Sequence, residues 1–154
     1  MKIIYLILLF STGLFAQDLE YLKSRDTLYL AVPKQDKHQY GKFLYFSSWN
    51  SEQKHYEFRQ PDEKHILILT IKDKETNPEK RNLTVRRKKF LKKYKKDIVD
   101  VDFLNSTGLY TLFMEIVRGN GKKKIVYIID EKECTGKEFV LKRAYIAEFG
   151  FINM

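Results

Sequence analysis

The sequence contains one cysteine, Cys134, among its 154 residues. A single thiol cannot form an internal disulfide, so a folded domain must be held together by packing. No cysteine stands directly after the apolar run at the start of the chain, which argues against a lipid-modified bacterial lipoprotein. Cys134 stands between acidic residues and Thr135-Gly136 in a turn-like context. We interpret it as an incidental thiol, with intermolecular pairing as the alternative.

Motifs of known chemistry are also missing. The sequence has no Gly-x-Ser-x-Gly, no phosphate-binding loop and no dinucleotide fingerprint, so no cofactor is expected. Its three histidines lack the spacing of metal ligands on one helix, and the segment 97–102 lacks the glycine and terminal glutamate of an EF-hand loop. Asp100 and Asp102 could hold a cation on one side of a strand. We favour instead that Asp97 ends one helix and Asp102 caps the next, so no metal site is assigned.

The first residues have the pattern of an export signal. Met1-Lys2 gives a short basic start, an apolar run extends from Ile3 through Phe10, and small Ala16 precedes polar Gln17. The apolar run is short for a membrane span, so we expect cleavage after Ala16, with an uncleaved anchor as the alternative. The expected location is secreted or periplasmic, and the absence of disulfides fits bacterial export.

Residues 17–154 are expected to form a single globular α+β domain. They retain 28 basic and 20 acidic side chains, because the first 16 residues contain only Lys2 among the charged types. A chain of this length buries about 68% of its unfolded surface, which is enough for one core. The apolar and aromatic content argues against disorder.

Four early runs of aromatic and branched residues predict strands, at Thr27–Val32, Lys42–Ser47, Tyr56–Gln60 and His65–Ile71. The run 66–71 is apolar on both faces and predicts a central strand covered from two sides. The turn-forming segment 60–64 predicts a hairpin between the last two strands. Lys72–Arg81 reads as an exposed connection.

The hydrophobic period then changes to that of helices. Phe90, Leu91, Tyr94 and Ile98 recur at helical spacing, as do apolar residues within 109–117, and the second helix is expected to end at Gly119–Gly121 with a left-handed glycine cap. Late strands are predicted at Lys123–Asp130 and Glu138–Ala147. This order favours an antiparallel sheet of about five to six strands with two helices inserted between early and late strands, packed on one face. An all-β fold is the alternative if 109–117 is a strand.

One segment carries the positive charge. Between Lys80 and Lys96 there are ten lysines and arginines and no acid, and the rest of the mature chain has a net charge of −2. Wound as a helix from Thr84 to Lys96, the segment gathers Phe90, Leu91 and Tyr94 on one face, with Arg87 the one cation on that side. The opposite half carries Lys95 and the candidate binding residues Arg86, Lys88, Lys89, Lys92, Lys93 and Lys96.

A basic face of this density could bind phosphates or anionic lipid head groups, and the structural alternative is a solvated surface helix. Trp49 is a second candidate ligand contact, since it stands in the polar, loop-like stretch Ser47–Ser51. We therefore expect an exported, non-enzymatic binding protein whose partner is an anionic polymer, an anionic membrane surface or an acidic protein.

Two other functional classes stay open. One is a small periplasmic or secreted hydrolase or nuclease acting on a polyanion, which would require His55 or His65 to converge with a carboxylate in a cleft. The other is a structural envelope protein without a specific ligand.

The export signal predicts a processed protein. Intact-mass analysis of the exported chain is expected to show loss of the first 16 residues, because Ala16-Gln17 is the small-residue junction after the apolar run. A soluble chain recovered from the cytoplasm with Met1–Ala16 still attached would contradict the assigned location.

Overall fold

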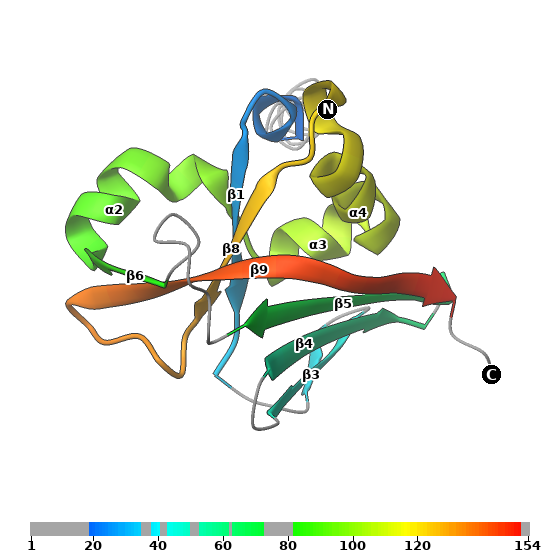
Figure 1. The fold of residues 1–154 in the computed structure, drawn as a ribbon, viewed down its shortest axis with the longest axis horizontal. Coiled ribbons are helices and arrows are strands. Elements are labelled where there is room, and N and C mark those ends of the chain that lie inside the picture. Colours follow the sequence, from blue (N-terminus) through cyan, green and yellow to red (C-terminus); the bar gives the residue numbers. More distant parts are fainter. Residues whose placement is uncertain are drawn as a thin grey trace, which may run out of the picture.

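A computed structural model describes residues 19–34, 38–40, 43–49, 53–61, 63–72 and 82–151 (Figure 1). The predicted signal peptide and most of the predicted connection 72–81 lie outside these ranges. Across the described residues, nine strands form one sheet in which parallel and antiparallel neighbours both occur.

The first part of the sheet is built around β1 (Thr27–Val32). It lies parallel to β7 (Ile98–Val99) on one side and to β8 (Ile125–Asp130) on the other. Strand β9 (Glu138–Phe151) runs antiparallel to β8, and β6 (Leu83–Arg86) runs antiparallel to the start of β9. Long connections containing helices join β1 to its parallel neighbours, as parallel pairing requires.

The second part is an antiparallel meander. It comprises β2 (His38–Tyr40), β3 (Phe43–Trp49), β4 (Gln53–Gln60) and β5 (His65–Lys72), each paired with the next. The turn 60–65 joins β4 and β5, so the predicted hairpin is confirmed. Leu67, Leu69 and Ile71 are buried, whereas Ile66 and Ile68 on the other face of β5 are half-buried. The central position of β5 is therefore confirmed, but its second face is only partly covered.

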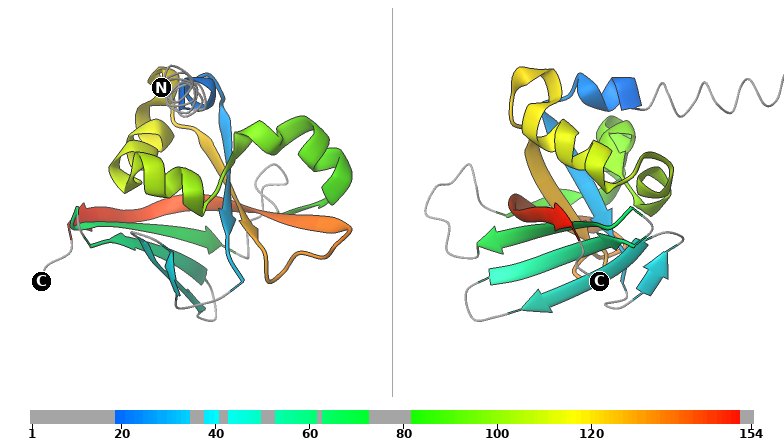
Figure 2. Two further views of the ribbon diagram at one scale, coloured as in Figure 1. Left: turned by 180° about the vertical axis from the view of Figure 1, so that it is seen from behind. Right: turned by 90° about the vertical axis from the view of Figure 1, so that its right-hand side faces the viewer.

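Strand β9 joins the two parts. Its first half pairs with β6 and β8, and its second half, from Tyr145 onward, pairs with β5. The register shifts where Ile68 faces Glu148 while Leu69 faces Ile146, which leaves Ala147 as an extra residue. Such a bulge increases local twist. Figures 1 and 2 show β9 as one long ribbon crossing β8 and continuing alongside β5.

The α+β class is confirmed, and the predicted antiparallel sheet of five to six strands is corrected to a mixed sheet. The correction arises at β1, because both of its partners come from late in the chain and run parallel to it. Composition identified Thr27–Val32 as a strand but contains no information about which strand lies beside it. The all-β alternative is wrong, since residues 109–118 are helical.

The observed helices begin and end at residues that differ in part from the predicted bounds. Residues 19–23 are helical, and they are followed later by α2 (Arg87–Tyr94), the 3₁₀ turn η2 (Lys95–Asp97), α3 (Val101–Thr107), α4 (Leu109–Arg118) and the 3₁₀ turn η3 (Gly119–Gly121). The helix predicted from Thr84 therefore begins at Arg87, because residues 83–86 pair with β9 instead. Ile98, placed on that helix by its spacing, lies in β7.

Helix α3 was not predicted. Asp100, not Asp102, is its cap: the Asp100 carboxylate accepts a hydrogen bond of 2.9 Å from the Phe103 N–H, and Asp102 lies in the first turn. Asp97 ends η2, as expected, and is fully buried with its carboxylate 2.8 Å from the Arg25 Nε.

Helices cover both faces of the β1–β8 region rather than one. Leu28, Leu30 and Val32 point into a core shared with α3 and α4, whereas Tyr29 points into a second core shared with α2. The alternation along β1 separates the two cores. Figure 2 shows α2 on one flank of the molecule and α3 with α4 on the other.

The end of α4 differs from the predicted glycine cap. Gly119 has φ −54°, and it is Gly121 that has a positive φ of 69°. A Cβ on Gly119 would lie 2.2 Å from Cε of Lys124, so this glycine allows a close approach. Lys124 is buried and donates to the Leu22 carbonyl (3.1 Å), the Lys23 carbonyl (2.8 Å) and the Arg25 carbonyl. It thereby satisfies carbonyls at the end of the helical segment 19–23.

The second core predicts how strongly α2 is docked. Phe90→Ala is expected to lower the free energy of unfolding by about 3–5 kcal/mol, because Phe90 is 3% exposed. Leu91→Ala should cost less, about 1–2 kcal/mol, since Leu91 is half-buried. Equilibrium urea unfolding measures both, with Lys92→Ala as the exposed control, and equal effects of Phe90→Ala and Lys92→Ala would contradict the docked helix.

Candidate functional site

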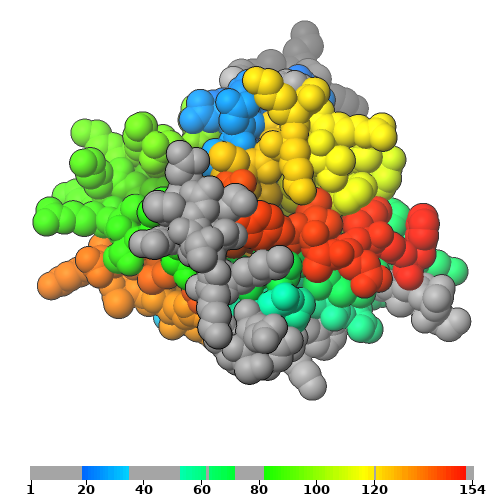
Figure 3. All heavy atoms as spheres, viewed as in Figure 1, coloured from blue at the N-terminus to red at the C-terminus, as the bar shows by residue number. Residues whose placement is uncertain are grey.

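The structure places the cations of the β6–α2 segment at the surface. Apart from Arg87, each cation of residues 86–96 is exposed, and within the described ranges none of these forms an ion pair with a carboxylate. In Figure 3 the side chains of this segment stand out along one flank of the molecule. We call this set the basic surface; it consists of Arg86, Lys88, Lys89, Lys92, Lys93, Lys95 and Lys96.

Arg87 differs from its neighbours, as its predicted position on the apolar side indicated. Its guanidinium lies 4.6 Å from the centre of the Phe139 ring and 3.7 Å from the Glu131 carboxylate. Its backbone N–H donates to the Lys137 carbonyl at 2.8 Å. Arg87 therefore attaches the start of α2 to the start of β9 instead of contributing to the basic surface.

Aromatic packing attaches the rest of α2. The Phe90 ring meets the Tyr29 ring edge-on at 4.8 Å and the Phe139 ring at 5.6 Å. Tyr94 is half-buried, with its ring 5.1 Å from Phe90 and 5.5 Å from Tyr29. The apolar side of α2 is thus occupied by the second core, and its charged side is left to solvent.

A hollow of about 440 Å³ opens beside this attachment. Three members of the basic surface, Arg86, Lys89 and Lys93, line it together with apolar or aromatic side chains from the same segment. The Lys93 ammonium lies 4.9 Å from the centre of the Tyr94 ring. We call this feature the α2 hollow; it is lined by Val85, Arg86, Lys89, Phe90, Lys93 and Tyr94.

Tyr94 also lines a second, polar hollow of about 290 Å³ that includes Arg25, Tyr29 and Asp97. Burial raises the pKa of Tyr29 to about 12, with additional contributions from Tyr94 and Asp97. Tyr29 is therefore protonated at neutral pH. The Arg25–Asp97 pair connects the chain before β1 to η2 and holds the end of α2 in place.

The remaining site candidates do not join the basic surface. Trp49, expected in a loop, is the last residue of β3 and pairs with Lys54. His55 lies on β4 opposite Ser48 and Thr70. His65 contacts a carboxylate, with its Nδ1 3.5 Å from Glu63 Oε2, but this pair does not line the α2 hollow.

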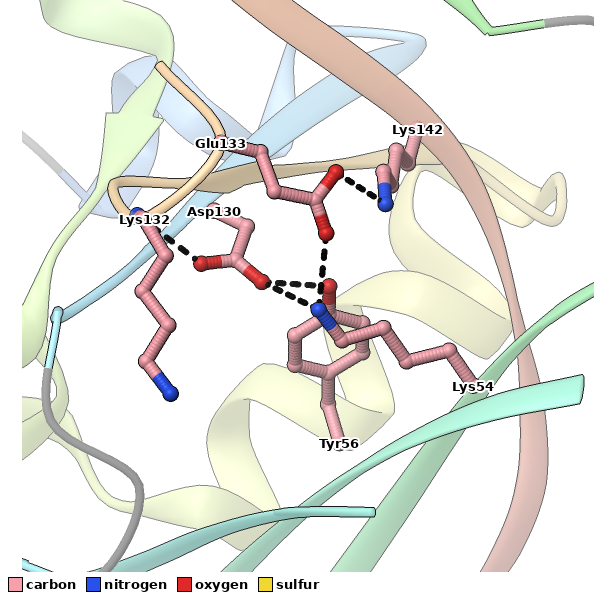
Figure 4. A network of polar contacts seen from close by, with 6 residues as sticks. All are labelled: Lys54, Tyr56, Asp130, Lys132, Glu133 and Lys142. Atoms are coloured by element: carbon pink, nitrogen blue, oxygen red, sulfur yellow. Dashed lines mark hydrogen bonds and ion pairs between the residues drawn. The ribbon is translucent and has the colours of Figure 1, made fainter. Parts of the chain in front are cut away.

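Sequence reasoning missed a polar network between β4, the end of β8 and β9 (Figure 4). Asp130, whose side chain is 2% exposed, accepts from Lys54 Nζ at 2.7 Å and from the Tyr56 hydroxyl at 2.8 Å. Lys54 also contacts Glu133 at 2.8 Å, and Glu133 pairs with Lys142. The two lysines and two carboxylates balance in charge.

The pKa values of Lys54 and Glu133 indicate that this network stabilises the fold and does not carry out proton transfer. Burial opposes charge on Lys54, but hydrogen bonds to Asp130 and Glu133 outweigh it and raise the lysine pKa above 10.5. Burial likewise opposes charge on Glu133, but hydrogen bonds from Lys142 and Lys54 outweigh it and hold the pKa below 4.5. Neither group is therefore poised for proton transfer at neutral pH. The only signal in the sequence was an alternating Lys54–Tyr56 pair on a strand, which many solvated strands share.

Comparisons with known proteins found no matching family model, and no curated protein or solved structure with significant similarity. No helix within the described ranges is long and apolar enough to cross a membrane. The assignment of function therefore rests on the basic surface and the hollow beside it.

Removing the central carboxylate should separate β4 from the β8–β9 turn. Asp130→Ala is expected to lower the free energy of unfolding by about 3–5 kcal/mol, because it leaves the 12% exposed Lys54 side chain without its closest partner. The control Glu131→Ala removes a partly exposed partner 3.7 Å from Arg87 and should cost at most about 1 kcal/mol. Chemical denaturation of both variants measures the difference, and equal losses would contradict the network's role.

The same network predicts a pH dependence of stability. Because the folded pKa of Glu133 is depressed, its contribution is complete above 4.5 and is lost as the pH falls through the folded value. Because the folded pKa of Lys54 is raised, its contribution is complete below 10.5 and is lost as the pH rises further. Urea midpoints of the wild type and Glu133→Gln should converge between about pH 7 and about pH 3. A gap that does not change with pH would show that the ionised form of Glu133 does not contribute to stability.

Proposed function

We propose that this chain is an exported, non-enzymatic binding protein that engages an anionic partner through the basic surface. The observation that carries the proposal is the exposure of seven cations within the eleven residues 86–96, without a carboxylate partner among the described residues. By contrast, several carboxylates elsewhere in these ranges each contact a cation, namely Asp97, Asp130, Glu131 and Glu133.

The arrangement has an energetic cost for the isolated protein. Helix α2 has no acid in its first turn and no side-chain cap, and cations near that positive end typically cost about 0.3–1 kcal/mol each. Lysines also face lysines one turn apart, at positions 88 and 92 and at 89 and 93, where like charges repel. A bound anion would offset both terms, so the pattern favours a partner over a merely solvated helix.

Export supplies the setting for this proposal. Cleavage after Ala16 would place the basic surface in the periplasm or outside the cell, where anionic polymers, membrane surfaces and acidic proteins are available. Since the rest of the mature chain has a net charge of −2, attraction should be confined to this flank of the molecule.

A charge-matched pair of variants tests the proposal. In the first, Lys89, Lys92, Lys93 and Lys96 are replaced by glutamine, and a duplex DNA oligonucleotide serves as a linear polyanion of known charge spacing. Wild-type binding should weaken with salt, and the slope of log K against log salt should shrink by about 0.9 for each phosphate that the variant no longer neutralises.

The control replaces four exposed lysines away from α2, namely Lys34, Lys64, Lys122 and Lys123, by glutamine. It has the same net charge as the first variant, so it should keep nearly the wild-type slope and affinity if the basic surface mediates binding. Equal weakening by both variants would indicate attraction by total charge, and undiminished binding by the first would leave the lysines as a solvated face.

A further inference from the structure

We propose that the α2 hollow binds a single anionic amphiphile, a molecule with a phosphate or carboxylate head and an apolar body. This inference rests on the proposed function and specifies its ligand. The three cations Arg86, Lys89 and Lys93 would hold the head group, and the apolar body would lie against Val85, Phe90 and Tyr94.

Helical spacing brings these groups together. Lys89 and Lys93 are four residues apart on α2 and so lie on one strip of the helix, and Arg86, the last residue of β6, lines the hollow with them. The pairs 85/86, 89/90 and 93/94 each place a cation next to an apolar or aromatic side chain. An arginine can also bind a phosphate or carboxylate through two parallel hydrogen bonds.

The size and lining of the hollow favour a discrete ligand over a long polyanion. Small-molecule sites typically measure about 300–1,000 Å³, and the hollow has a volume of about 440 Å³. A polyanion needs only a charged track, and it would gain nothing from the half-buried Val85 and Tyr94 that line the hollow with the cations.

The packing of α2 also argues against insertion into a membrane. A helix that lies in a lipid interface buries its own apolar face among the acyl chains. In this protein Phe90 on that face is 3% exposed and contacts Tyr29 and Phe139. The fully exposed side chains of α2 are all lysines, so a lipid molecule would have to enter the hollow individually.

Two double variants with the same charge distinguish the hollow from the general basic surface. Lys89→Gln/Lys93→Gln changes two lining residues, whereas Lys88→Gln/Lys92→Gln changes two exposed lysines of the same helix that do not line the hollow. Calorimetric titration with dodecyl phosphate, below its micelle-forming concentration, should show one site on the wild type. The lining variant should bind it about tenfold more weakly or worse, and the other double variant should bind as the wild type does.

Three further titrants define the ligand class. Dodecyl maltoside, which has an uncharged head, and inorganic phosphate, which has no apolar body, should each bind far more weakly than dodecyl phosphate. Stronger binding to vesicles of equal parts phosphatidylglycerol and phosphatidylcholine, with no binding of the monomeric amphiphile, would overturn the inference in favour of a membrane surface.

The outcomes also separate this inference from the proposed function. If both double variants lose equal affinity for dodecyl phosphate, or if only the DNA duplex binds, the hollow is not a site although the basic surface still binds anions. If neither probe binds the wild type, the proposed function and the inference both fail.

Discussion

The pairing of β9 with partners on both of its halves is the constraint on which the rest of the structure depends. Its first half completes the β1–β8 region and carries β6, and its second half closes the β2–β5 meander. Because β6 leads directly into α2, the same strand also fixes where the basic surface lies. The bulge at Ala147 lies within the half of β9 that pairs with β5, and the Lys54–Asp130–Glu133 contacts join β4 to the end of β8 as a second connection between the two regions.

Local pattern identified most of the elements but not their neighbours. The boundaries of β1, the β4–β5 hairpin and α4 followed from composition, period and turn residues, all of which act over a few positions. The parallel pairing of β1 did not, because the partners of Thr27–Val32 lie about seventy and a hundred residues later. The helix predicted from Thr84 includes residues 84–86 for the same reason, since their pairing with β9 is a long-range contact.

The basic surface could be found from the sequence because net charge is local and survives any folding of the segment. The sequence could not show that the cations of this segment have different roles. Arg87 contacts Phe139 and Glu131, and three of the remaining cations converge on a hollow, yet all are the same residue types in one short run. Only the docking of Phe90 and Tyr94 determines which cations face a ligand-sized space. The network around Asp130 was invisible because its members come from three strands and a turn that lie far apart in the sequence.

The separation of packing from charge in α2 has an evolutionary consequence. The residues that attach the helix, Arg87, Phe90 and Tyr94, are different from the exposed lysines that surround them. Substitutions at the lysines therefore alter what the protein attracts with little effect on whether it folds. A lineage could exchange one anionic ligand for another, or lose binding altogether, by successive single changes on this flank while every intermediate kept its core. The flank can thus diversify rapidly, whereas β9 and its partners must remain nearly fixed.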